Sequence, residues 1–337
     1  MEHHSDSIQI LTDSLLQGNR RALAKAISLV ESSLDEDRKQ SEILLKSIVS
    51  HTGKAIRIGI TGTPGVGKST FIEKFGLHCI NNNRKPAILA IDPTSQSHGG
   101  SILGDKVRMP ELARNQHAFI RPSPSRLTLG GVSNATREAV LLCEAAGFDT
   151  IIIETVGVGQ SEVEVRSMTD IFLLLTLPAS GDEVQGIKRG IMELSDIIFI
   201  NKADGPLIPL AEIAKGQLQS ALTLMNSPTE HWDVAVLAGS GLHGIGIVEL
   251  WNTCLKFMNA DDERKSTILK RRELQEIEWL NIATQRELLR WLHDNNTWNA
   301  LKESAILEIK NGNDVPSLAA KNLVKSFADS AGFKDIP

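Results

Sequence analysis

Eight consecutive residues early in the chain carry its clearest chemistry. Residues 62–69 read Gly-Thr-Pro-Gly-Val-Gly-Lys-Ser, with an apolar run at 56–60 before them and a helix-compatible stretch at 70–77 after them. In this strand, loop and helix context the spacing is typical of a P-loop, which cradles nucleotide phosphates. Glycines let backbone N–H groups turn toward an anion, and the start of the helix adds partial positive charge. The alternative is a glycine-rich turn that binds nothing, and the complete pattern in this context argues against it.

The residues of this loop have different expected roles. The Lys68 ammonium is expected to reach the β- and γ-phosphates and to act in catalysis, and the Ser69 hydroxyl is expected to ligate Mg²⁺. The residues expected to bind the nucleotide in this segment are Gly62, Thr63, Pro64, Gly65, Val66, Gly67, Lys68, Ser69 and Thr70.

A second motif predicts which base is bound. An apolar run at 196–200 ends in Asn201-Lys202-Ala203-Asp204. The Asp204 carboxylate can accept hydrogen bonds from both guanine N1–H and the 2-amino group, whereas adenine would leave it unpaired and be rejected. Asn201 is expected to brace the loop, and Lys202 to lie along the base. By itself the motif could be an exposed turn, but downstream of a P-loop and at a strand end it favours guanine. Candidate backbone contacts to the guanine oxygen follow a strand-like run at 234–238: Ser240 and Gly241.

The segment between these motifs has the features of a γ-phosphate sensor. An apolar run at 150–154 ends in Glu154, and Gly157 follows three residues later. Glu154 is expected near Mg²⁺, directly or through water, and the Gly157 N–H near the γ-phosphate, so both are candidate catalytic residues. The loop after them would order or relax with nucleotide state. The alternative is a strand that happens to end in glutamate. Two further candidate Mg²⁺ ligands are Asp92, which ends its own strand, and Asp105, for which a solvated loop aspartate is an equal interpretation.

The residue after this glycine bears on the rate of hydrolysis. In Ras-like GTPases a glutamine stands there and orients the attacking water. Here the position is Val158, which cannot do so, and Gln160 lies two residues further on. Hydrolysis of GTP to GDP and phosphate is therefore expected to be slow until a partner or a self-contact completes the site.

The elements that must position these residues follow an α/β order. Residues 7–50 have helical spacing, residues 51–259 alternate strand-like and helical stretches, and residues from 261 onward are helical and charged. The expected fold is a P-loop NTPase with a mostly parallel sheet covered by helices, extended by helices at both ends. The expected domains are an N-terminal helical extension (1–50), a GTPase domain (51–259) and a C-terminal helical arm (260–337). The predicted strands are 56–61, 87–92, 118–121, 150–154, 171–176, 197–200 and 234–238.

Composition excludes several classes of protein. The net charge of −5 over 337 residues is not the excess of basic residues that is typical of nucleic-acid-binding proteins. No apolar run approaches the ~20 residues of a membrane span. The cysteines, three in all, are scattered, and the N-terminus lacks the arginine-rich character of a transit peptide. A cytoplasmic protein without nucleic-acid or membrane partners is expected.

Four segments resemble one known family. They are residues 90–94, 99–109, 121–131 and 154–162. They are similar to the methylmalonyl-CoA mutase-associated GTPases of MeaB/ArgK type, within the metallochaperone-like P-loop GTPases. The likeness runs from about residue 15 to 205 and resumes weakly in the C-terminal helices. It implies a GTP/GDP- and Mg²⁺-dependent chaperone that gates cofactor loading and protects an adenosylcobalamin-dependent acyl-CoA mutase. It also implies a homodimer, with residues 260–337 as the C-terminal helical dimerisation arm, and the cobalamin adenosyltransferase as a further partner.

The resemblance also implies a mobile loop that couples nucleotide state to the mutase. This loop matches residues 178–190, in which two glycines flank charges of both signs. A solvated turn is the alternative interpretation. One departure from the family pattern is Gly241, where alanine is common. The residues expected to carry the coupling are Gln160, Asp182, Glu183, Gln185 and Lys188.

Three other functions remain open from the sequence. A nickel-insertion GTPase would need a metal-gathering cluster, yet His3-His4 is the only adjacent histidine pair and cysteine pairs are absent. A small-molecule kinase of a transport system would transfer phosphate to a substrate rather than to water. A nucleotide-controlled scaffold would bind GTP without productive hydrolysis, and Val158 keeps this alternative open.

Overall fold

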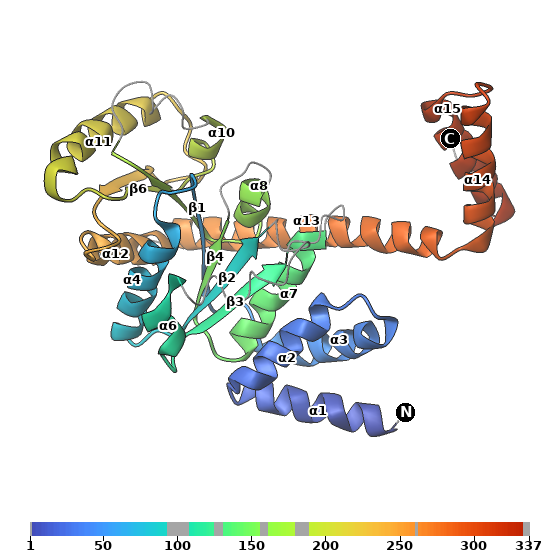
Figure 1. Cartoon of the computed structure of the whole chain (residues 1–337), viewed down its shortest axis with the longest axis horizontal. Coiled ribbons are helices and arrows are strands. Elements are labelled where there is room, and N and C mark those ends of the chain that lie inside the picture. Colours follow the sequence, from blue (N-terminus) through green and yellow to red (C-terminus); the bar gives the residue numbers. More distant parts are fainter. Residues whose placement is uncertain are drawn as a thin grey trace. The chain divides into compact units, whose positions relative to one another are not determined.

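A seven-stranded parallel sheet forms the centre of the protein (Figure 1). The computed structural model describes residues 2–92, 108–124, 131–155, 161–178, 189–259 and 262–332. The strand order is β3-β2-β4-β1-β5-β6-β7, and every neighbouring pair is parallel. The predicted fold class and all seven predicted strands are confirmed. The strands are β1 (Ile56–Gly62), β2 (Pro86–Asp92), β3 (Phe119–Pro124), β4 (Thr150–Glu154), β5 (Ile171–Thr176), β6 (Ile197–Ile200) and β7 (Ala235–Ala238).

The central strands are buried on both faces, which explains their continuous apolar runs. Every residue of β4, β5 and β6 is buried. On one face, the sheet packs against α4 (Lys68–Asn81) and α12 (Ile247–Met258). On the other, α7 (Gly131–Ala145) covers the β2–β4 side and α11 (Ile208–Leu222) covers the β5–β7 side. Each fully buried large apolar side chain contributes ~1.5–3 kcal/mol, so the two faces together supply the core's stability.

The N-terminal helices pack onto α7 rather than projecting alone. They are α1 (Glu2–Leu16), α2 (Arg20–Glu31) and α3 (Asp35–Ile48). Leu15, Leu23 and Ile27 are fully buried in the same apolar cluster as the inner face of α7. Asn19 caps α2, since its side chain accepts hydrogen bonds from the next backbone N–H groups. The helical spacing predicted for this region is confirmed.

Short elements complete the connections between strands. They are η1 (Val49–His51), α6 (Pro110–Arg114), α8 (Ser161–Arg166), α10 (Arg189–Met192) and η2 (Gly205–Leu207).

The chain forms two compact units, residues 1–276 and residues 277–337. The long helix α13 (Asp262–His293) begins in the first unit and ends in the second, followed by α14 (Asn296–Lys310) and α15 (Pro316–Ser330). Within the second unit, Phe327 packs against Trp291 and Trp298, at ring-centroid distances of 5.6 and 5.3 Å. Residues 311–315 separate the last two helices, because α14 ends at Lys310 and α15 begins at Pro316.

In the described residues, no helix combines the length and hydropathy needed to cross a membrane.

Cys79, Cys143 and Cys254 are free and buried. Burial raises the pKa of the Cys79 thiol to about 12, so it stays protonated near neutral pH.

Candidate functional site

Those predicted site residues that the structure describes gather at one edge of the sheet. Parallel strands place their carboxyl ends together, and in an open α/β sheet this edge binds ligands where the strand order reverses. β1 has β4 on one side and β5 on the other. Ile60 of β1 lies opposite Glu154 of β4, and Gly62 opposite Leu175 of β5. The residues that follow β1, β6 and β7, and Thr155 after β4, therefore lie at this same edge of the sheet.

The glycine-rich loop after β1 leads directly into α4, as predicted. Val66 is fully buried and anchors the loop, whereas Thr63, Pro64 and Gly65 are exposed to solvent. Gly67 caps α4 with φ +94°, a left-handed conformation that favours glycine. A Cβ atom there would also lie 3.0 Å from the side-chain nitrogen of Asn201. The loop thus brings backbone N–H groups and a helix N-terminus to an open surface suited to an anion.

Lys68, the first residue of α4, extends back over this loop. Its Nζ donates hydrogen bonds to the carbonyls of Gly62 (2.6 Å) and Thr63 (3.4 Å). Burial lowers the pKa of the Lys68 ammonium, and the carboxylates of Glu154 and Glu162 partly oppose this effect. The ammonium is therefore held at the loop between backbone carbonyls and two acidic groups.

Ser69 and Glu154 come together from different elements. The Ser69 hydroxyl donates to Oε1 of Glu154 at 3.4 Å, and Glu154 is buried at the end of β4. The next residue, Thr155, is clamped to β1, because its N–H donates to the Ile60 carbonyl (3.0 Å) and its hydroxyl to the Thr61 hydroxyl (2.9 Å). A hydroxyl beside a carboxylate is an all-oxygen donor set, which fits Mg²⁺.

Several predicted site residues cannot be placed. Asp92 ends β2, but its side chain lies outside the described residues. The other predicted residues outside the described ranges are Asp105, Gly157, Gln160, Asp182, Glu183, Gln185 and Lys188.

The base-reading loop contacts the P-loop directly. The Asn201 side chain donates to the Val66 carbonyl (2.8 Å), and Nζ of Lys202 donates to the Gly65 carbonyl (2.8 Å). Lys202 has φ +59°, which is unusual for a residue other than glycine. Asp204 lies at the end of this turn, where it precedes η2. These bonds fix the spacing between the phosphate-binding and base-reading loops, a contact that the sequence motifs alone do not specify.

Gly241 joins the loop after β7 to the same assembly. Its N–H donates to Oδ1 of Asn201 at 2.7 Å. A Cβ atom at Gly241 would lie 2.9 Å from Cα of Phe71 in α4 and 3.2 Å from Oδ1 of Asn201. Glycine therefore fits the close approach of this loop to α4, and an alanine would require a backbone shift. Ser240 is fully buried and pairs with Ile245 across the turn (3.0 and 3.1 Å).

Two neighbours of the site were not singled out in the sequence: Phe71, against which Gly241 packs, and Glu162, whose charge acts on Lys68. The signal for Phe71 was its position in the first turn of the helix after the P-loop. Glu162 ends the residue 154–162 segment that resembles the family, but its effect on Lys68 arises only when β4 pairs with β1.

A parallel sheet whose central strand leads into the residue 62–69 loop and then into α4 defines a P-loop NTPase. The protein-family model described as "Methylmalonyl Co-A mutase-associated GTPase MeaB" matches residues 23–297. The chain belongs to this family, and it is a GTPase.

Individual relatives agree over nearly the whole chain. GTPase ArgK of Escherichia coli K12 is 44% identical over 309 residues, which cover 92% of this chain and 93% of that protein. The Mus musculus protein named "Methylmalonic aciduria type A homolog, mitochondrial" is 41% identical over 333 residues, covering 94% and 79%. A crystal structure of a protein named LAO/AO transport system kinase superimposes with a TM-score of 0.74 at 37% identity, covering 96% of this chain and 98% of that one. Membership of a GTPase family implies binding of GTP and GDP, typically with Mg²⁺.

Replacing Glu154 with alanine should suppress GTP turnover on the order of 100-fold, because its carboxylate is expected to act beside the γ-phosphate. GDP affinity should stay within about threefold of the parent value, because the diphosphate lacks the γ-phosphate. Phosphate release at saturating GTP and calorimetry with GDP measure the two effects. Glu249→Ala, which removes an exposed carboxylate from α12, is the control. Turnover equal to that of the parent would remove Glu154 from the site.

Proposed function

We propose that this GTPase is a chaperone for an adenosylcobalamin-dependent acyl-CoA mutase such as methylmalonyl-CoA mutase. In this role it gates cofactor loading and protects the mutase against inactivation. The observation that carries the proposal is the match of residues 23–297 to a family described as mutase-associated. The name of the mouse relative, which refers to methylmalonic aciduria, supports the same assignment.

The described residues suggest how GTP would be held. Backbone N–H groups of the 62–69 loop and the N-terminus of α4 would bind the phosphates, with Lys68 moving from the Gly62 carbonyl to the β- and γ-phosphates. Asp204 would accept from guanine N1–H and the 2-amino group. Asn201 and Lys202, already bonded to Val66 and Gly65, would hold the base-reading loop at the correct distance.

Mg²⁺ fits the oxygen donors of Ser69 and Glu154, which lie 3.4 Å apart. When bound there, the ion would neutralise charge developing on the phosphates. Asp92 and Asp105 remain proposed additional ligands. In the ranges that the structure describes, no group of three or more His, Cys, Asp or Glu side chains could hold a metal ion. A nickel-insertion role is not proposed.

Slow hydrolysis without a partner is part of the proposal. Its support is Val158, which stands after Gly157 where Ras-like GTPases have a water-orienting glutamine. The mutase would then complete the site or stabilise the productive arrangement. Coupling to the mutase is proposed for Gln160, Asp182, Glu183, Gln185 and Lys188.

A homodimer through residues 260–337 is also proposed. In the second unit, α14 has no buried residue, and α15 buries only Ala319, Phe327 and Ala328. Large apolar side chains are half exposed or more there, including Leu280, Leu289 and Leu307. A second copy covering this surface would remove it from water.

In the proposed domain division, residues 1–50 are the N-terminal extension and residues 51–259 are the GTPase domain.

Two finer points complete the scheme. The cobalamin adenosyltransferase is a proposed further partner, which would hand over the cofactor. The three buried free cysteines suit a reducing compartment, and this is the basis for proposing a cytoplasmic location.

The second candidate function is a small-molecule kinase of a transport system. The observation that favours it is the name of the similar crystal structure, LAO/AO transport system kinase. The two functions differ in where the γ-phosphate goes, since a GTPase releases it as inorganic phosphate and a kinase transfers it to a substrate. Stoichiometric phosphate release in the absence of any small-molecule acceptor would support the GTPase function alone.

The cognate mutase should accelerate GTP turnover by at least about tenfold, because a partner that completes a GTPase site can raise the rate by orders of magnitude. Lys188→Ala should bind GTP like the parent, because the P-loop is unchanged, but should lose most of the acceleration. Phosphate release is measured with and without the mutase for both proteins. No acceleration by any acyl-CoA mutase would contradict the chaperone function, whereas full acceleration of Lys188→Ala would contradict only the role of this loop.

A further inference from the structure

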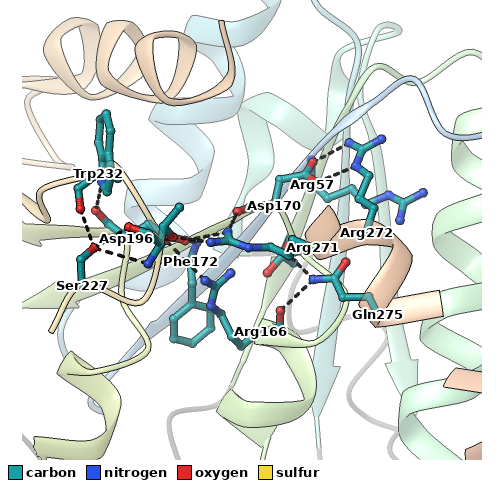
Figure 2. A network of polar contacts seen from close by, with 12 residues as sticks. Arg57, Arg166, Asp170, Phe172, Asp196, Ser227, Trp232, Arg271, Arg272 and Gln275 are labelled. Atoms are coloured by element: carbon teal, nitrogen blue, oxygen red, sulfur yellow. Dashed lines mark hydrogen bonds and ion pairs between the residues drawn. The ribbon is translucent and has the colours of Figure 1, made fainter. Parts of the chain in front are cut away.

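The segment that joins α8 to β5 is held by a side chain from α13. Nε2 of Gln275 donates to the carbonyls of Arg166 (3.2 Å) and Thr169 (2.9 Å), and Gln275 is only 8% exposed (Figure 2). The last carbonyls of a helix have no partner within the helix itself. The C-terminal end of α8 is therefore capped by a residue more than 100 positions away in the chain.

A third helix, α7, contacts both α13 and the end of α8 at this point. Arg137 of α7 donates from Nη1 to the Gln275 carbonyl (3.2 Å) and from Nη2 to the Ser167 hydroxyl (2.6 Å). Arg137 is 5% exposed. Buried hydrogen bonds of this kind are costly to break singly, since each leaves a desolvated group behind. The end of α8 cannot shift without changing contacts to both α7 and α13.

The other end of α8 lies at the nucleotide site. The helix begins at Ser161, directly after the segment predicted to sense the γ-phosphate, and Glu162 is 1% exposed and acts electrostatically on Lys68. A helix of six residues is about 9 Å long, so α8 links Glu162 to the Gln275-bound carbonyl of Arg166 within two turns. A displacement at Glu162 therefore reaches Arg166.

Two arginines of α13, Arg271 and Arg272, bind residues that precede the strands, at the edge of the sheet opposite the nucleotide site. Arg272 forms two 2.7 Å bonds to the Asp170 carboxylate and donates to the carbonyls of Gly53 (2.6 Å) and Ala55 (2.7 Å). Arg166 of α8 and Arg271 of α13 both meet the Asp196 carboxylate, at 3.4 and 3.5 Å. Of the contacts among described residues, none satisfies the buried Nη1 of Arg166. The end of α8 therefore keeps an unused donor beside the contacts that join it to α13.

We infer that Gln275 and Arg137 are positioning residues for α8, which begins at the nucleotide site, and that the segment of α13 around Arg271–Gln275 thereby responds to which nucleotide is bound. This inference depends on the GTPase activity of the chain and not on the mutase. By linkage, if the Gln275 contacts are stronger in one nucleotide state, losing them must change the relative affinity for the two nucleotides by the same factor.

The test compares two variants in the full chain, each of which removes two bonds from α13 to backbone carbonyls. Gln275→Met loses the bonds to Arg166 and Thr169, and Arg272→Lys loses those to Gly53 and Ala55 while keeping a positive charge beside Asp170. Calorimetry gives Kd for GDP and for a non-hydrolysable GTP analogue. The ratio of the two Kd values should change at least threefold in Gln275→Met and stay constant in Arg272→Lys. Equal changes for both nucleotides in Gln275→Met, or an equal ratio change in Arg272→Lys, would overturn the inference.

A second measurement does not depend on either variant folding. Amide hydrogen exchange over residues 268–279 of the parent protein should differ between the GDP-bound and analogue-bound states. Identical exchange in the two states would also overturn the inference. Because no mutase is present in either experiment, failure here is distinguishable from failure of the chaperone function.

Discussion

Replacing Asp204 with asparagine should weaken GTP binding by about 100-fold or more and shift preference toward xanthosine triphosphate. The aspartate can accept from two guanine donors, and hydrogen bonds to a charged group contribute ~1.5–3 kcal/mol each. An asparagine amide would instead face the 2-amino group with a donor, whereas the 2-oxo group of xanthine can accept from it. The parent protein should likewise reject ATP by at least ~100-fold.

Calorimetric titration of parent and variant with GTP, XTP and ATP measures these preferences. Asp233→Asn makes the same chemical change at an exposed position before β7 and should leave all three affinities unaltered. If the parent bound ATP and GTP equally, the base-reading role of residues 201–204 would be wrong.

Replacing Lys68 with alanine should lower GTP affinity by about 100- to 1000-fold, since the ammonium is expected to form charge-assisted bonds to two phosphates. GDP affinity should fall less, because the diphosphate lacks the γ-phosphate contact. The Lys68 ammonium now rests on the Gly62 carbonyl at 2.6 Å, so its removal takes away a loop contact as well as the charge.

Nucleotide titration of the variant should be paired with Lys74→Ala. Lys74 lies on the same helix, and its Nζ is 3.5 Å from the Glu111 carboxylate. That substitution removes an equal charge from α4 outside the P-loop and should change neither affinity by more than about twofold, because solvent-exposed ion pairs contribute little. A Lys68→Ala protein that bound GTP like the Lys74→Ala control would show that the loop holds phosphate by backbone groups alone.

The strands were predictable because a doubly covered parallel sheet needs apolar residues on both faces of every central strand. The continuous runs of β4, β5 and β6 could therefore be located without knowing their partners. β3 differs, since it continues to Pro124 where residues 118–121 had been predicted. It contains prolines, which interrupt a central strand, but β3 is at the edge of the sheet and pairs only with β2.

The P-loop and base-reading motifs were predictable because each is a short local pattern that follows a strand. Their mutual contacts were not, because the bonds from Asn201 and Lys202 to Val66 and Gly65 span more than 130 residues. The contacts that Arg271 and Arg272 of α13 make were not predictable either. Asp170 and Asp196 each stand one residue before an apolar strand, and such buried carboxylates need cationic partners. The partners, Arg271 and Arg272, lie 75 to 102 residues further along the chain, and no local pattern connects them.

The placement of β1 has a consequence for synthesis on the ribosome. β1 is the central strand, yet its register pairs Ile56 with Thr150 and Ile58 with Ile171. Neither neighbour exists until about 100 further residues have been translated, which takes on the order of 5–20 s at cellular rates. During that interval an apolar segment and the loop that follows it are without strand partners, and non-local pairing of this kind is intrinsically slow. The nascent chain is therefore most exposed to misassociation before β4 emerges, and a chaperone that binds unfolded chains, or a pause in translation before residue 150, would have its greatest effect in this interval.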